Sequence, residues 1–409
     1  MSQRSSNTQK GLRQRTISNG LNLVESQVST LYEDTKHETL TLATNSNLNW
    51  GTQALYRIQE RGVCLHDINI SMDIGSITGL TGGPARLCSS NGFFQRAEIK
   101  INGLVKQTLY PLANHLINQL FFSDDDRNLT NNLSNHYASP TLRTLNGATS
   151  TTYIIPLVSM FNATNMPIQT TSHEVEIILY LNPLSEVLVL NGATGVGSVP
   201  ILASSVVSKI TRMSPSISES RLTNMGIVSE NSIYHDVLPQ QYNVSTGLTR
   251  TQLILSHLAQ KKVCFFMIVV RDANKVIGDG LHSYNKIQSF IITDARTNHI
   301  TGGLEVTESV SKFLSQYYAD STYTSETASS AGRNGVIQDT GANVAMFSHS
   351  SNFSKAFSVG KMNGSRTYEG NESVYVTFKN ALTTPTVVDV LAFCESVMTQ
   401  GPFGVEVSL

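Results

Sequence analysis

The chain has 409 residues, and at about 150 residues per domain this length predicts two or three domains and excludes a single small one. Hydrophobic residues make up 40% and charged residues only 14%, a composition typical of strands and loops rather than of long helices. The 29 basic and 30 acidic residues give a formal net charge of −1, which argues against a protein that binds nucleic acid over its whole surface.

The N-terminal segment is basic and otherwise polar. Its basic residues are Arg4, Lys10, Arg13 and Arg15, and no acidic residue precedes Glu25. Such a segment has too few apolar residues to fold alone and is typical of a mobile arm that becomes ordered on a partner. It also lacks the apolar core of a signal peptide, and no apolar run in the sequence approaches the ~18 residues that span a bilayer.

From about Trp50 onward, short segments that alternate apolar and polar residues are separated by Gly, Asn, Ser and Pro. In Cys64–Ile74 (CLHDINISMDI) the apolar residues mostly keep the period of two that half-buried strands require. Further predicted strands are Ala97–Ile101, Thr152–Val158, Glu174–Leu181, Glu186–Leu190, Val263–Val270, Ile287–Thr293, Val374–Lys379 and Thr386–Phe393. Two segments instead have helical spacing, namely Pro111–Phe122, with proline in the first turn, and Glu308–Tyr318.

The two halves of the chain carry these elements in the same order. The predicted strands and helices align at offsets of 191 to 199 residues, as for Asn114 and Val310 in the two helices. A long polar stretch follows each helix, Ser123–Ser150 in the first half and Ala319–Asn343 in the second. The sequence therefore predicts a duplication, although two unrelated β domains that share strand spacing remain an alternative.

The duplication predicts how the chain is divided into domains. Residues 1–49 form an arm and entry segment, and residues 50–195 form the first β domain. Residues 196–224 form a linker rich in small residues, and residues 225–409 form the second domain.

Motifs for catalysis, cofactors or metals fail at specific positions. The glycines of Glu186–Gly197 (EVLVLNGATGVG) lack GxGxxG spacing, and Pro200 interrupts the segment that would have to be a helix, so a flexible linker is favoured. His173-Glu174 begins like HExxH, but Ile177 replaces the second histidine.

Clustered carboxylates and cysteines give no stronger signal. Asp124, Asp125 and Asp126 could attract calcium, but Asn135 stands where a bidentate glutamate would be needed, so a solvated loop is favoured. The four cysteines lie far apart without a CxxC pair, which argues against zinc and against a secreted disulfide framework. We expect no catalytic group, no cofactor, no metal and a reduced, intracellular site of synthesis.

Four stretches carry a resemblance to a known family. They are Cys64–Ile74 after Arg61-Gly62; Phe93–Phe122 with the turn Asn102-Gly103; Tyr153–Leu181, containing Ile155-Pro156-Leu157 and His173-Glu174-Val175; and Ser232–Gln241 (SIYHDVLPQQ). In this order they resemble the double jelly-roll major capsid proteins of nucleocytoplasmic large DNA viruses, virophages and polinton-like viruses. The modest length and the single tryptophan, Trp50, favour a small virus or a virophage-like source.

The resemblance implies an all-β fold of two tandem antiparallel eight-stranded jelly-roll β-sandwiches with short helices in the loops. It also implies a pseudo-hexameric homotrimeric capsomer, part of an icosahedral DNA-virus shell and located in the virion. The expected partners are neighbouring capsomers and minor capsid and penton proteins, together with an inner membrane or the genome through the interior-facing basic arm. Outward-facing residues are expected in the two polar stretches, namely Asp124, Asp125, Asp126, Tyr323 and Arg333.

Three other functions remain open from the sequence. A capsid-like scaffold that acts only during assembly would have the same fold. A glycan-binding β-sandwich adhesin would share the strand pattern, although a secretion signal and more than 7% aromatic residues would be expected of it. A dehydrogenase that uses the turn Gly192–Gly197 would have to bind a dinucleotide.

Overall fold

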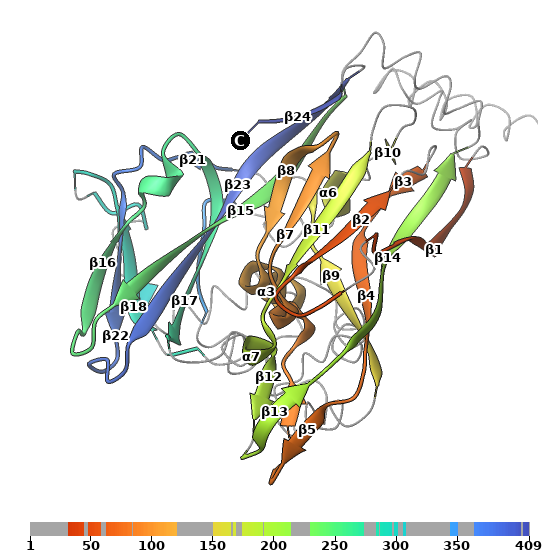
Figure 1. Ribbon diagram of the computed structural model, residues 1–409. Helices are drawn as coiled ribbons and strands as arrows, with labels where there is room; N and C mark the ends of the chain where they lie inside the picture. Colours follow the sequence, from red (N-terminus) through yellow and green to blue (C-terminus); the bar gives the residue numbers. More distant parts are fainter. Residues whose placement is uncertain are drawn as a thin grey trace, which may run out of the picture.

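The computed structural model describes residues 32–44, 48–58, 63–83, 85–120, 150–164, 167–168, 174–190, 192–213, 230–273, 284–285, 287–296, 298–301, 306–307, 344–350, 364–401 and 404–408. Their strands form antiparallel sheets that pack as two sandwiches side by side (Figure 1).

The first sandwich contains two facing sheets. The larger sheet has the order β10–β3–β14–β4–β9, with β1 beside β14. Its strands are β1 (Tyr32–Leu42), β3 (Val63–Leu65), β4 (Ile68–Ile74), β9 (Thr151–Leu157), β10 (Pro167–Ile168) and β14 (Ile201–Met213). The smaller sheet has the order β2–β11–β7–β8 and contains β2 (Gln53–Ile58), β7 (Phe94–Ile101), β8 (Leu104–Leu109) and β11 (Val175–Leu181).

The second sandwich repeats this arrangement. Its larger sheet has the order β15–β23–β17–β20, with β24 beside β23 and β21 beside β17. These strands are β15 (Glu230–Val244), β17 (Lys262–Asp272), β20 (Ala345–Ser348), β21 (Arg366–Thr367), β23 (Thr386–Gly401) and β24 (Gly404–Ser408). The smaller sheet, β16–β22–β18–β19, contains β16 (Arg250–Ile254), β18 (Ile287–Thr293), β19 (Val306–Thr307) and β22 (Ser373–Phe378).

The strand orders of the two sandwiches correspond one to one. The path β1–β14–β4–β9 matches β15–β23–β17–β20, and β2–β11–β7–β8 matches β16–β22–β18–β19. Each half therefore has four strands facing four in jelly-roll order, which confirms the all-β double jelly-roll prediction and the duplication inferred from the strand offsets.

The remaining elements lie between strands. They are β5 (Thr78–Thr81), β6 (Ala85–Leu87), β12 (Leu188–Leu190) and β13 (Thr194–Ser198), the helices α3 (Pro111–Leu120), α6 (Met160–Thr164) and α7 (Leu184–Val187), and the 3₁₀ turns η1 (Ser90–Phe93) and η2 (Ser256–Leu258). Of the two predicted helices, the first is confirmed as α3, and Glu308–Tyr318 lies outside the described residues.

Strand alternation builds a separate core inside each sandwich. In β4, buried Ile68, Ile70, Met72 and Ile74 alternate with partly exposed polar residues, as half-buried strands require. The core of the second sandwich is built in the same way from inward residues such as Phe266 on β17. Apolar burial at roughly 25 cal/mol per Å² is the main stabilising contribution in each core.

The segment expected to be a linker is folded. β13 and β14 occupy much of residues 196–224, and β14 lies in the first large sheet between β3 and β4. Its inward positions include Ser204 and Ser208, which donate hydrogen bonds to the backbone oxygens of Ser71 and Asp67. A segment rich in small polar residues therefore looks like a linker in the sequence. In the structure its inward serines are buried, and their hydroxyl groups have hydrogen-bond partners inside the sandwich.

Two predicted strands are interrupted. Cys64–Ile74 is divided into β3 and β4 at His66 and Asp67, where a side-chain oxygen of Asp67 accepts a hydrogen bond from the backbone of Lys209 at 2.5 Å. Glu186–Leu190 begins as the end of α7 and becomes extended only at Leu188, because Pro183 provides the start of a helical turn.

Candidate functional site

The junction between the two jelly rolls is built around α3. This helix follows β8 of the first jelly roll and lies between the two sandwiches (Figure 1). Its buried Leu112, Ala113, Leu116 and Ile117 form one cluster with residues of β17 and β23 from the second jelly roll. The helix of one jelly roll thus covers the outer face of the other jelly roll's large sheet.

The sequence of β17 explains why this face needs a cover. Its run Val263–Val270 is buried without a break, because Phe266 and Ile268 point into the second core while Phe265, Met267 and Val269 pack in the junction. A continuous apolar strand is typical of a sheet buried on both faces. Phe265 and Phe393 also make an edge-to-face contact, with ring centroids 5.6 Å apart.

Asparagines fix α3 on the first jelly roll. The side-chain nitrogen of Asn114 donates to Asn91 Oδ1 and to the carbonyl of Pro156, both at 2.7 Å, while its oxygen accepts from the backbone of Val158 at 2.8 Å. Asn118 adds a bond to the carbonyl of Pro156 at 3.2 Å. Because these buried amides have their partners, the helix is held in a defined orientation.

A polar contact crosses the same junction. Gln107 on β8 donates from Nε2 to Asp236 Oδ1 on β15 at 3.3 Å, and its Oε1 accepts from the backbone N–H of Met160 at 2.8 Å. Burial raises the pKa of Asp236 to about 6, although bonds from Gln107 and from the backbone of Val237 oppose this shift. Burial lowers the pKa of neighbouring His235 to about 4.

The outer face of the first large sheet has a different character. The outward residues Asn69, Ser71 and Asp73 on β4 are polar and partly exposed. Val207 on β14 lies on the same face, paired with Asn69 and Thr39. This face corresponds by topology to the apolar face of β17 and β23 that α3 covers in the second jelly roll.

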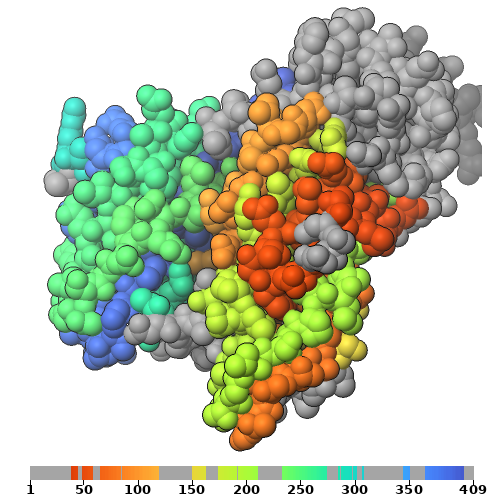
Figure 2. Space-filling view, viewed as in Figure 1, coloured from red at the N-terminus to blue at the C-terminus, as the bar shows by residue number. Residues whose placement is uncertain are grey.

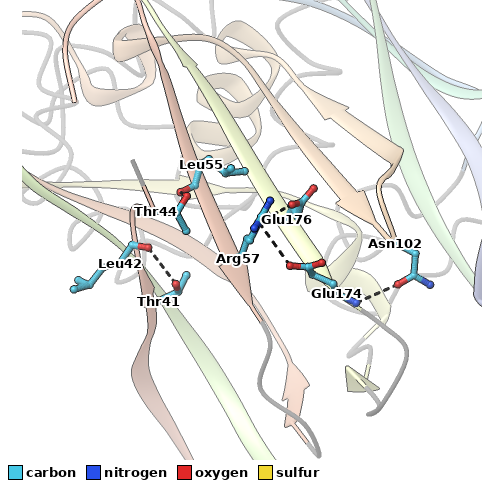
Figure 3. A network of polar contacts seen from close by, with 8 residues as sticks. All are labelled: Thr41, Leu42, Thr44, Leu55, Arg57, Asn102, Glu174 and Glu176. Atoms are coloured by element: carbon cyan, nitrogen blue, oxygen red, sulfur yellow. Dashed lines mark hydrogen bonds and ion pairs between the residues drawn. The ribbon is translucent and has the colours of Figure 1, made fainter. Parts of the chain in front are cut away.

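Two segments of the family-like pattern meet on the first jelly roll (Figure 3). Asn102 adopts a φ of 52° in the turn between β7 and β8, and its Oδ1 accepts from the backbone N–H of Glu174 at 3.1 Å. Arg57 on β2 pairs through Nε with Glu176 at 2.9 Å and with Glu174 at 3.7 Å. These contacts connect β2 and the turn after β7 to the beginning of β11. They lie at an exposed edge, where ion pairs contribute little to stability.

The glycine-rich segment forms a projecting ribbon. β13 pairs with β5, and the two strands extend from the lower end of the first jelly roll (Figure 2). A Cβ on Gly195 would lie 2.7 Å from the carbonyl oxygen of Gly79, so the glycines permit close approach of the two strands. Because β14 rather than a helix follows, the segment lacks the strand-to-helix turn that a dinucleotide site requires.

Metal-ligating side chains do not gather in the described part of the chain. No group of three or more His, Cys, Asp or Glu side chains there could hold a metal ion. Cys88, Cys264 and Cys394 are buried, and burial raises the pKa of the last two to about 12, which disfavours the nucleophilic thiolate. None of the helices among the described residues is long and apolar enough to span a membrane.

The residues predicted for the arm and for the outward loops lie outside the described residues. These are Arg4, Lys10, Arg13 and Arg15, and Asp124, Asp125, Asp126, Tyr323 and Arg333. Their predicted locations stay predictions. The sequence reasoning missed Gln107, Asp236 and the junction face of β17, and only the unbroken apolar run of β17 could have indicated a second buried face.

Fold and geometry together define a double jelly roll with a packed junction between its halves. No protein-family description and no curated protein matches the sequence.

Solved structures with this fold include viral capsid proteins. PBCV-1 VP54, fitted into a reconstruction of the virophage Sputnik, has a TM-score of 0.65 and 13% identity over 92% of this chain and 97% of that chain. The Faustovirus major capsid protein has a TM-score of 0.61 and 10% identity over 89% of this chain and 90% of that chain. The mavirus major capsid protein has a TM-score of 0.50 and 13% identity over 91% of this chain and 90% of that chain. At these identities the likeness establishes the fold.

Proposed function

We propose that the chain is a structural major capsid protein that forms homotrimeric, pseudo-hexameric capsomers of an icosahedral DNA-virus shell and is located in the virion. The observation that carries the proposal is the duplicated topology, in which two jelly rolls are joined by α3 packing on the sheet of β17 and β23. The likeness in fold to major capsid proteins over most of both chains supports it.

The geometry of the junction favours a closed ring of three chains. Within one chain, the second jelly roll presents the outer face of its large sheet to the first jelly roll. The corresponding face of the first jelly roll, around Asn69, Ser71 and Val207, would receive the second jelly roll of a neighbouring chain. Three chains would then present six jelly rolls around one axis, and such a heterologous contact closes on itself when the rotation per chain is 120°.

The character of this face suits a contact between chains. Its few charged side chains would limit the desolvation cost of association. A permanent contact of this kind commonly buries more than about 2,000 Å² in total.

A matched pair of valine substitutions tests the trimer. Val207→Arg places a cation on the outer face of β14, whereas Val105→Arg makes the same change on β8, where Val105 is 49% exposed. We expect the wild type and Val105→Arg to be trimeric by light scattering and pseudo-hexagonal by negative-stain microscopy. Val207→Arg is expected to be a folded monomer, because an unpaired charge would be buried at the contact.

The outcomes separate the proposed function from the alternatives. A wild-type monomer with an intact fold would overturn the trimer, and glycan binding by that monomer would support an adhesin. Trimers found in assembly intermediates but not in finished particles would support a transient scaffold.

The remaining partners are also proposed. Neighbouring capsomers and minor capsid and penton proteins would contact the capsomer sides. The basic arm with Arg4, Lys10, Arg13 and Arg15 would face the interior. Four charges give only a weak grip on phosphates at physiological salt, so protein neighbours rank above the genome or an inner membrane.

Limited proteolysis tests the location of the arm. We expect cleavage within the first 20 residues of free capsomers and protection of these residues in intact particles. Cleavage at the same rate in both would contradict an interior arm.

A further inference from the structure

The carboxyl group of Asp236 is buried at the junction between the two jelly rolls. Asp236 is 8% exposed and its Oδ1 accepts from Gln107 Nε2 across the junction. Gln107 is itself 4% exposed, and the bond from Met160 to its Oε1 directs its NH₂ group toward the carboxyl group. The contact therefore joins β8 and β15 in one orientation and is shielded from bulk water.

The groups around Asp236 do not neutralise a carboxylate. The titratable groups that interact electrostatically with Asp236 are Tyr110 directly after β8, Tyr234 on β15, Cys394 on β23 and Lys261 after η2, and His235 is its neighbour on β15. Of these, only Lys261 is cationic at neutral pH, and among the described residues no cation lies within ion-pair distance of Asp236. The ionised form is thus stabilised only by hydrogen bonds from Gln107 and from the backbone of Val237 and by Coulombic attraction to Lys261 beyond ion-pair distance, which together do not offset the burial of the charge.

Water has little room at this junction. A cavity of about 20 Å³ lies beside the contact and is lined by residues of both jelly rolls, including Gln107, Tyr110, Tyr234 and His235. A cavity of this size holds about one water molecule, which cannot replace the hydration shell of a carboxylate. Ionisation of Asp236 therefore leaves a poorly solvated charge between two packed surfaces.

We propose that the contact between Gln107 and Asp236 is a pH-sensitive latch that holds the two jelly rolls together more tightly in mild acid than at neutral pH. Protonation removes the buried charge, and the neutral carboxyl group still accepts the hydrogen bond from Gln107. The latch lies within one chain, so it does not depend on the proposed trimer.

Two of the buried residues at the junction, Asp236 and His235, titrate between pH 3.8 and 6.5, and they affect stability with opposite signs. The pKa of Asp236 is raised from 3.8 to about 6, so its charge destabilises the fold above pH 6, and this cost disappears as the pH falls from 6 toward 3.8. The pKa of His235 is lowered from 6.5 to about 4, so its contribution to stability is lost as the pH falls from 6.5 to 4. The dependence of wild-type stability on pH combines both effects, so a variant is needed to separate them.

Asp236→Asn isolates the effect of the buried charge, because asparagine has nearly the same side-chain shape as aspartate but is neutral. The melting temperature of the full chain is measured at pH 7.5 and pH 4.5 for both proteins. At pH 7.5 we expect the variant to melt about 3 °C higher, and at pH 4.5 we expect this difference to shrink to about 1 °C, because part of the cost remains until the pH reaches 3.8. His235 is present in both proteins, so its effect cancels in the comparison.

Two further variants control the experiment. Asp389→Asn breaks a buried ion pair with Arg271 on the outer face of the second large sheet and should lower the melting temperature at both pH values. Gln107→Glu places a second carboxylate opposite Asp236 and should enlarge the difference in melting temperature between pH 4.5 and pH 7.5.

Hydrogen exchange locates the effect at the junction. At pH 7.5 the amides of Met160 and Val237 should exchange more slowly in Asp236→Asn than in the wild type, and at pH 4.5 this difference should be much smaller. The latch is refuted if Asp236→Asn melts at or below the wild-type temperature at pH 7.5, if the difference is the same at both pH values, or if exchange at these amides is unchanged.

Discussion

Two buried aspartates in the second jelly roll show how the surroundings decide the effect of a charge. Asp389 on β23 is 2% exposed and accepts from Arg271 Nε at 2.5 Å and from Nη2 at 3.2 Å, a geometry that satisfies both oxygens. Asp236 has an amide instead of a guanidinium as its cross-junction partner. The residue type alone therefore does not indicate which buried carboxylate has a positively charged partner.

The ion pair of Arg271 and Asp389 should stabilise the fold, because each charge compensates the other. Arg271→Met should reduce the free energy of unfolding by about 3 to 5 kcal/mol, because it leaves Asp389 buried without a compensating charge. The double variant Arg271→Met/Asp389→Leu should recover most of this loss, since no buried charge remains. Chemical denaturation measures both, and equal losses in the single and double variants would contradict the explanation.

At the scale of elements, periodicity predicted strands well because alternation reports one buried face directly. It located β4, β7, β9, β11, β18 and β22, and the helical spacing after Pro111 located α3. Composition misled at β14, where Ser204 and Ser208 resemble linker residues but are bonded inside the sandwich. The rule that glycine and serine mark linkers fails where their small side chains fit an inner sheet face.

The candidate site was less accessible to sequence reasoning than the fold. The Asn102-Gly103 turn could be read locally, because a left-handed backbone between strands favours these residues. The contact of Asn102 with Glu174 joins positions 72 residues apart, and the contact of Gln107 with Asp236 joins positions 129 apart. Pairings of this range depend on how whole sheets pack, which no local pattern specifies.

At the scale of the whole molecule, duplication produced two jelly rolls with the same topology and different outer faces. The large sheet of the second jelly roll is apolar on its outer face, with Phe265, Met267 and Phe393 beneath α3. The first jelly roll has polar residues at the corresponding place, such as Asn69 and Ser71 on β4. Tyr234 and Met398 from the second half also enter the core of the first jelly roll. Apolar residues of the second half are therefore buried by the first half, although the second half also has its own core.

Separating the two halves tests this dependence of the second half on the first. Residues 230–408 produced alone should aggregate and bind a hydrophobic dye, because the face that α3 covers would be exposed. Co-production with residues 32–213 should restore a dye-free complex, and Phe265→Ser/Met267→Ser in the isolated half should reduce dye binding. The same double change in the full chain should lower the melting temperature, because there the two side chains are buried in the junction. An isolated second half that stays monomeric and binds no dye would show that the junction face does not need its cover.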